Sequence, residues 1–143
     1  MSLTVLQTRL KTLVLAEPLL ANRPVLIEDK GNLVYDVEAA LATTALAIVI
    51  SPTRGQAAPD QPKGSINSEE AFDVVIHRGA LADTDSPSTV AVLDALRVRL
   101  HGALVSESGP GSGRRFRYLG HDLRELGDGA YARALGIGVI DAG

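Results

Sequence analysis

The C-terminal part of the chain limits the fold most strongly, because large and small residues alternate there in a regular way. Residues 115–119 and 131–140 both alternate like β-strands, and Gly127, Asp128 and Gly129 supply a turn between them. In the second run the large side chains fall on odd positions and the small ones on even positions: Tyr131, Leu135, Ile137 and Val139 against Ala132, Ala134, Gly136 and Gly138. We therefore predict a C-terminal β-hairpin with one face on a core and the other open to close approach by another surface.

Three further segments carry helical patterns. Four leucines near the N-terminus recur at spacings of three, four and three, which places Leu3, Leu6, Leu10 and Leu13 on one helical face. Thr4 and Gln7 form a capping-box pattern, and Pro18 is expected to end or kink this helix. A second, short helix is predicted from Asp36 as its N-cap, and a third from Ser86-Pro87, with Val92 or Leu93, Leu96, Leu100 and Leu104 as its buried stripe.

Strand signals lie between these helices. Strands are predicted at 25–28, at 47–50 and at 71–77, and Pro52 is expected to end the second of them. Residues 53–67 contain two glycines and two prolines among polar residues, which predicts a long mobile loop. Taken together, the sequence predicts a single α+β domain over residues 1–143, with a mostly antiparallel sheet flanked by helices.

Composition excludes several functions. The 143 residues suit one domain, and a net charge of −3 argues against a partner made of free nucleic acid. The chain has no cysteine, so disulfides and thiolate chemistry are excluded. Arg9, Lys11 and Glu17 interrupt the apolar N-terminal run, so we expect a cytoplasmic protein without a leader. No run reaches the roughly 18 apolar residues that a membrane span needs.

The candidate catalytic residues are few. The histidines at 77, 101 and 121 are scattered, without the spacing of a metal site, so neither a metal nor another cofactor is expected. His121 and Asp122, with Arg124 nearby, form the least ordinary group, but adjacent residues of an extended segment point to opposite faces. The Gly-rich stretch 109–113 lacks the lysine and hydroxyl of a phosphate-binding loop. We therefore expect a protein that is not an enzyme.

The arginines of the C-terminal hairpin leave two alternatives open. Arg115 and Arg117 are alternate positions and would share one face of a strand. They either pair with acidic residues of another subunit or remain solvated. The residues that we predict to form an assembly interface are Arg115, Arg117, Tyr131 and Arg133 on the hairpin, with Gln56 to Lys63 as a contact arm.

The order of the elements resembles a known group of proteins. The predicted elements follow one another in this order: a Leu-rich helix, a short helix, strands at 46–50 and 72–76, a helix at 90–104, and a closing hairpin with Tyr131-Ala132-Arg133-Ala134-Leu135-Gly136-Ile137. This order is similar to that of the small tail-terminator and minor tail proteins of tailed bacteriophages and prophages.

The resemblance implies a structural subunit that completes the tail tube and joins it to the head. Such a subunit would assemble as a ring, often hexameric, contact tail-tube and head–tail connector proteins, and pass from the host cytoplasm into the virion tail. Residues 53–67 would then become ordered on assembly. Two other hypotheses stay open: a small enzyme or ligand-binding module with His121, Asp122 and Arg124 near a cleft, and an adaptor that docks a partner through the hairpin edge.

Overall fold

The computed structural model describes residues 2–29, 31–57, 59, 67–79, 85–107, 109, 113–127 and 130–142. In chain order its elements are α1 (Leu3–Leu15), the single 3₁₀ turn η1 (Pro18–Leu20), β1 (Val25–Ile27), α2 (Leu33–Thr43), β2 (Leu46–Ala57), β3 (Asn67–Arg78), α3 (Thr89–Leu100), β4 (Arg117–Gly127) and β5 (Ala130–Ala142). The prediction of an α+β fold with a C-terminal hairpin is confirmed. The first hairpin strand differs from the prediction, because it runs from Arg117 to Gly127 and not over residues 115–119.

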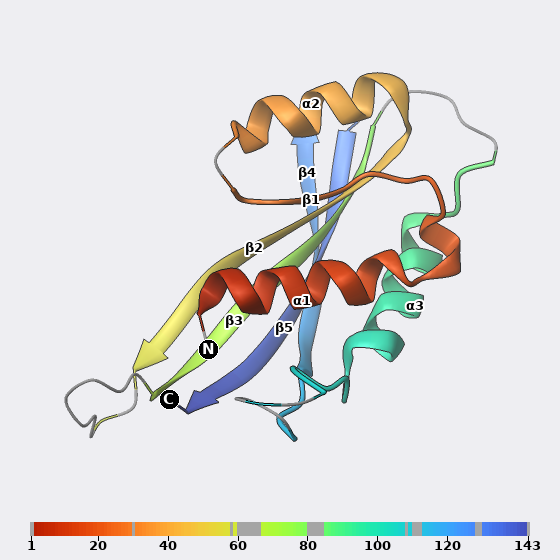
Figure 1. Cartoon of the computed structure of the whole chain (residues 1–143). Helices are drawn as coiled ribbons and strands as arrows, with labels where there is room; N and C mark the ends of the chain where they lie inside the picture. The colour runs from red at the N-terminus through yellow and green to blue at the C-terminus, as the bar shows by residue number, and fades with distance from the viewer. Residues whose placement is uncertain are drawn as a thin grey trace.

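The strands form one sheet in the order β1-β2-β3-β5-β4. Only β1 runs parallel to its neighbour, and the other neighbouring pairs are antiparallel. Helices α1 and α3 cover one face of this sheet, which we call the first face, and α2 lies on the other, the second face (Figure 1). Helices α1 and α3 therefore bury their apolar stripes against the sheet, whereas Leu33 and Val37 of α2 are only partly buried on it.

The main core lies between the first face and helices α1 and α3. Alternate residues of the three central strands point into it, and they are fully or almost fully buried: Leu46, Ile48, Ile50, Phe72, Val74, Ile76, Leu135, Ile137 and Val139. The helices contribute Leu6, Leu10, Val14, Val92, Leu93, Leu96 and Leu100. The predicted stripes of the first and third helices are thus confirmed, apart from Leu104, which follows α3 and bridges to Arg115, and Leu3, which is exposed.

The helix starts were predicted incorrectly. Ser2 caps α1 by accepting a hydrogen bond from the Val5 N–H, so Thr4 lies inside the helix. Asn32 caps α2, and Asp36 lies in its first turn. Ser88 caps α3, so the helix begins two residues after Pro87. In each case an earlier or later Ser or Asn provides the side-chain oxygen that a cap requires.

The prediction that Pro52 ends a strand is wrong. Strand β2 continues to Ala57 and pairs with β3 along its length, with a register shift between Pro52 and Arg54. The Ile48 N–H donates to the Pro24 carbonyl on the β1 side, and Pro52 faces the same side because strands repeat every two residues. Among the described residues, no partner strand lies on that side beyond Ile50, so the missing proline N–H costs no ladder bond there.

The predicted loop at 53–67 is therefore shorter than expected. Residues 53–57 belong to β2, and Asn67 begins β3. Residues 58 and 60–66, including Lys63, lie outside the described residues. Within the described residues, no helix is both long and apolar enough to cross a membrane.

Candidate interaction surface

The small residues of β5 lie on the second face, as the alternation predicts. The prediction that this face is open, however, is only partly right. Ala132 and Ala134 are buried, in a second cluster with Val49 and Val75, and Leu26, Leu33 and Val37 pack against that cluster. Leu119 of β4 lies over the two glycines, since a Cβ placed on Gly138 would be 3.1 Å from its Cδ atoms. The small residues therefore leave space that other side chains of the same molecule fill.

A charged pair crosses this small-residue strand. The Arg124 guanidinium on β4 donates to the Asp73 carboxylate on β3 at 2.8 Å, which takes it over β5. The Arg124 side chain can cross β5 because the residues of β5 between Arg124 and Asp73 are Ala and Gly, which have little or no side chain. His77 lies beside this pair. Its pKa is lowered below the usual range, first by burial and second by the charge of Arg124. His77 is therefore held as the neutral imidazole over a wider pH range than a free histidine.

The structure does not bring His121 and Asp122 together. His121 shares a 2.6 Å hydrogen bond with the Tyr118 hydroxyl and stacks on its ring, next to α3. Asp122 lies opposite Ala134 and 3.6 Å from Arg124 Nε, on the second face. Asp122 therefore does not orient His121 as a general base. In the part of the chain that the structure describes, no three metal-ligating side chains gather.

The predicted interface residues fall on several surfaces. Arg115 donates to the Gly102 carbonyl at 2.6 Å, whereas Arg117 lies opposite Gly138 and 3.9 Å from Glu69. The two arginines therefore have different surroundings. Gln56 is exposed on β2 and lines a pocket of about 240 Å³ together with Arg117.

The other two hairpin residues differ in their contacts. Tyr131 is half-buried and lies opposite Arg78 and Glu125. Arg133 donates from Nε to the Thr89 hydroxyl at 3.1 Å, which ties β5 to the start of α3. Arg133 thereby belongs to the first face, together with His121.

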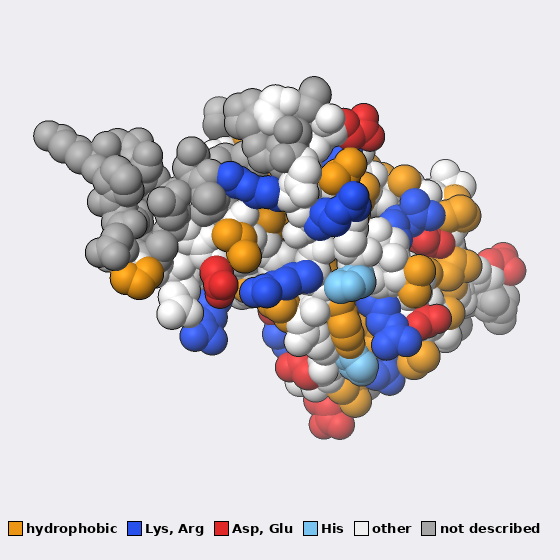
Figure 2. All heavy atoms as spheres, turned by 90° about the horizontal axis from the view of Figure 1, so that it is seen from below, with side chains coloured by type: hydrophobic (Ala, Val, Ile, Leu, Met, Phe, Trp, Pro, Cys, Tyr) orange, Lys and Arg blue, Asp and Glu red, His pale blue; other side chains and the backbone are white. Residues whose placement is uncertain are grey.

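A pocket of about 430 Å³ lies between α3 and the last two strands. Its apolar lining is formed by Val90, Ala91 and Leu93, and its polar lining by Ser88, Asp94, Arg97, His121 and Arg133. Figure 2 shows Lys, Arg and His side chains among hydrophobic ones on the face seen from below. An exposed apolar patch next to arginines is typical of protein interfaces.

Arg97 is held at the rim of this pocket by two neighbours. Asp94 accepts a hydrogen bond from Arg97 Nε at 2.9 Å, and the guanidinium carbon lies 5.9 Å from the centroid of the Tyr118 ring. The hydrogen bond with Asp94 is the main cause that raises the pKa of Arg97. Sequence reasoning did not identify Arg97 as a residue of this surface. The signal that could have indicated the surface was Val90, an apolar residue outside the predicted buried stripe of α3.

In the described part of the chain, other residues cover the outer edge of β4 at its start. The Phe116 N–H donates to the Ala103 carbonyl, and the Tyr118 N–H donates to Nδ1 of His101. Beyond this point β4 is the last strand of the sheet, and it exposes Leu119, Leu123 and Leu126, each by about half. Exposed leucines on an edge strand offer a place for association, and the charged residues Asp122, Arg124 and Glu125 of the same strand limit open-ended strand pairing.

The chain matches no family model, and it matches no curated protein. Solved structures do share its fold. A chain of the virion of a native gene transfer agent (GTA) particle aligns with a TM-score of 0.60 and 17% identity, over 99% of this chain and 100% of that chain. A second solved chain aligns with a TM-score of 0.53 and 15% identity, over 100% of this chain and 96% of that one. At these identities the likeness concerns the fold.

Proposed function

We propose that this chain is a structural subunit of a phage-derived particle, and that it completes the tail tube and joins it to the head. The observation that carries the proposal is the match to a chain of a gene transfer agent virion, which leaves almost no residue of either chain unaligned. A fold by itself hosts many functions. Here the order of elements in the sequence independently resembles that of tail-terminator and minor tail proteins.

The surfaces support an assembly role over a catalytic one. The exposed leucines of β4 and the apolar pocket beside α3 are features of contact surfaces. The alternative of a small enzyme built on His121 and Asp122 loses its basis, because the two side chains lie on opposite faces. An adaptor that docks through the β4 edge remains a variant of the same role.

The proposed subunit works as a homo-oligomeric ring, with six copies as the expected number. It forms in the host cytoplasm and then becomes part of the virion tail, in contact with tail-tube and head–tail connector proteins. Arg115, Arg117, Tyr131 and Arg133, with Gln56 and Lys63, remain the sequence-based candidates for its contacts. A ring needs two different patches on each subunit, one for each neighbour.

Particle composition tests the proposal. The gene is deleted in a strain that produces particles, and particles from parent and deletion strains are purified and compared by mass spectrometry and electron microscopy. We expect the chain in parental particles, and tails of abnormal length or heads without tails in the deletion strain. A plasmid copy restores normal particles. Normal, infective particles without the chain would contradict the proposal.

A further inference from the structure

The outer side of α2 is an unpartnered surface with an unusual exposure of large side chains. Val34 is 70% exposed and Tyr35 is 66% exposed, although both lie in the first turn of a helix. Glu38 follows Tyr35 by three residues and is also exposed, so the ring and the carboxylate are neighbours on one side of the helix. This side presents an apolar protrusion with a negative charge beside it.

The pocket beside α3 has the opposite character. Its apolar side is formed by Val90, Ala91 and Leu93. Its polar side holds the guanidinium groups of Arg97, which pairs with Asp94 of the same helix, and of Arg133. Its volume of about 430 Å³ is in the range of pockets that hold a compact organic group. Arginine pairs with carboxylates and also stacks on aromatic rings, so a Tyr and a Glu on one helix turn fit these groups.

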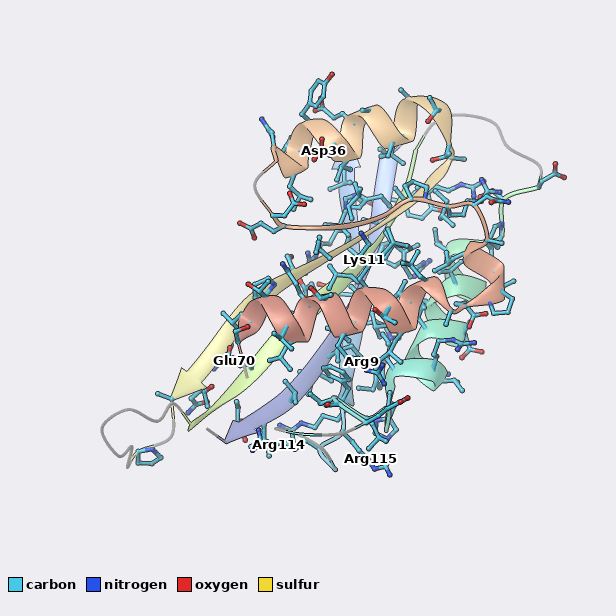
Figure 3. The ribbon with its side chains drawn as sticks, viewed as in Figure 1. Arg9, Lys11, Asp36, Glu70, Arg114 and Arg115 are labelled. Carbon is cyan, nitrogen blue, oxygen red and sulfur yellow. The ribbon has the colours of Figure 1, made fainter. Side chains whose placement is uncertain are left out.

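The charges of the two surfaces also differ in sign. Residues 28–45, which include α2, contain four acidic residues and one lysine, and Figure 3 shows Asp36 on this helix. The pocket is lined by Arg97, Arg133 and His121 and by one carboxylate, that of Asp94. Opposite charges favour contact between these two surfaces of neighbouring copies.

The two surfaces cannot meet within one copy. Leu33 and Val37 hold α2 on the second face, near β1 and β2, whereas the pocket lies on the first face at β5 and β4. An α2 helix that enters the pocket would therefore belong to another copy. The chain itself offers a protrusion of matching charge and polarity.

We infer that α2 of one copy docks through Tyr35 and Glu38 into the pocket between α3 and β5 of the next copy, with Arg97 and Arg133 as the partners of the carboxylate. This contact is heterologous, so each copy gives its helix to one neighbour and its pocket to another. The inference deepens the proposed function and rests on it, because it names the contact by which the subunits of the ring hold one another.

Cysteine crosslinking tests the contact directly, since the chain has no cysteine of its own. The double variant Val34→Cys with Val90→Cys places one thiol on the helix and one beside the pocket, at two exposed positions, and leaves Tyr35 and Glu38 in place. Under mild oxidation we expect a ladder of covalent oligomers that a reductant removes. Each single variant is the matched control and is expected to remain monomeric on a denaturing gel. A double variant that crosslinks no more than the singles, or a Val34→Cys single that gives complete covalent dimers, would overturn the inference.

Charge reversal gives a second test that does not depend on crosslinking. Glu38→Arg and Arg97→Glu are each expected to weaken self-association at least about ten-fold in analytical ultracentrifugation. An equimolar mixture of the two variants should associate again, because every contact in an alternating ring is then either native or reversed on both sides. Singles that associate like the parent, or a mixture that fails to recover while circular dichroism shows both variants folded, would count against the docking.

The two proposals fail separately. A chain that is found in particles but gives no ladder retains the structural role and loses this contact. A chain that gives the ladder but is absent from purified particles retains the contact and loses the tail role.

Discussion

At the scale of single residues, glycines act in two different ways on the outer strands. Gly120 in β4 has a φ of +130°, which side-chain-bearing residues rarely adopt, and it lies at a register shift in the pairing with β5. Gly136 lies directly opposite it, with a backbone outside the positive-φ range. One glycine is therefore needed for its backbone geometry, and the other only leaves space.

This difference predicts opposite effects for two alanine substitutions. Gly136→Ala places a Cβ at 3.4 Å from Leu119 Cβ, which is ordinary contact, and should stabilise the protein by about 0.4–1 kcal/mol by restricting the unfolded chain. Gly120→Ala should destabilise it by about 1–3 kcal/mol, because alanine is strained at this φ. Urea unfolding of the two variants beside the parent measures both. A stabilising Gly120→Ala would show that the positive φ is not required.

The lowered pKa of His77 predicts how the free energy of unfolding depends on pH. Its native pKa lies below the ordinary value of about 6.5 that it has when unfolded, because of burial and then of Arg124. Between the two values the unfolded chain binds more protons, so the free energy of unfolding rises with pH there and is constant with respect to this group below its native pKa. His77→Gln should flatten the rise.

Unfolding curves at several pH values, with the His77 resonance followed by NMR, check this expectation. Arg124→Gln is a useful companion, since it removes the charge and should move the pKa of His77 toward its ordinary value while leaving the burial. An unchanged pH dependence in His77→Gln would assign the effect to other groups.

At the scale of elements, the start of α3 joins the helix to the sheet. Ser88 caps the helix by accepting from the Ala91 N–H at 3.1 Å, and the next residue, Thr89, accepts from Arg133 of β5. Two neighbouring side chains thus fix both the end of the helix and its position.

Removal of the cap should have a moderate cost. Ser88→Ala is expected to lower the free energy of unfolding by about 0.5–2 kcal/mol, because a helix N–H loses its acceptor. Ser88→Asp retains an acceptor and adds a negative charge, which is favourable at a helix N-terminus. This variant should therefore unfold at the same temperature as the parent or at a slightly higher one. Thermal unfolding of both variants measures the difference. Equal losses in both would mean that the position matters for packing and not for capping.

The elements also show what the sequence reveals and what it hides. The alternation of 72–76 and 135–139 predicts the buried faces of these strands correctly, since the pattern records a single local period. The leucine spacing of α1 identifies Leu6 and Leu10 as buried, but Leu3 is exposed. The length of β2 could not be predicted, because it depends on a pairing with β3 that carries the strand past Pro52. The pocket beside α3 combines Arg97 with Arg133, residues that only the folded chain brings together.

At the scale of the whole molecule, the layers differ in how firmly they are held. Strand β3 has a partner on each side and three fully buried residues, Phe72, Val74 and Ile76. Helix α2 has no fully buried residue and lies on one face only. The centre of the sheet should therefore open only with the whole protein, whereas α2 opens more easily.

Amide hydrogen exchange measures this order. We expect the slowest exchange at 72–76 and much faster exchange throughout α2 in dilute protein. On self-association the exchange of α2 should slow while that of β3 stays the same. The Glu38→Arg variant serves as a control, in which α2 should stay fast at every concentration. An α2 as slow as β3 in dilute monomer would contradict this order of stability.

The strands extend beyond the helices at one end of the sheet, where residues 53–57 of β2 are all exposed (Figure 1). Five residues of strand measure about 16 Å. Because antiparallel pairing with β3 stiffens this extension, it moves as one body with the sheet. A small rotation of the subunit would therefore displace the end of this extension more than it displaces the residues under the helices. Any molecule bound at that end would be moved by the larger distance.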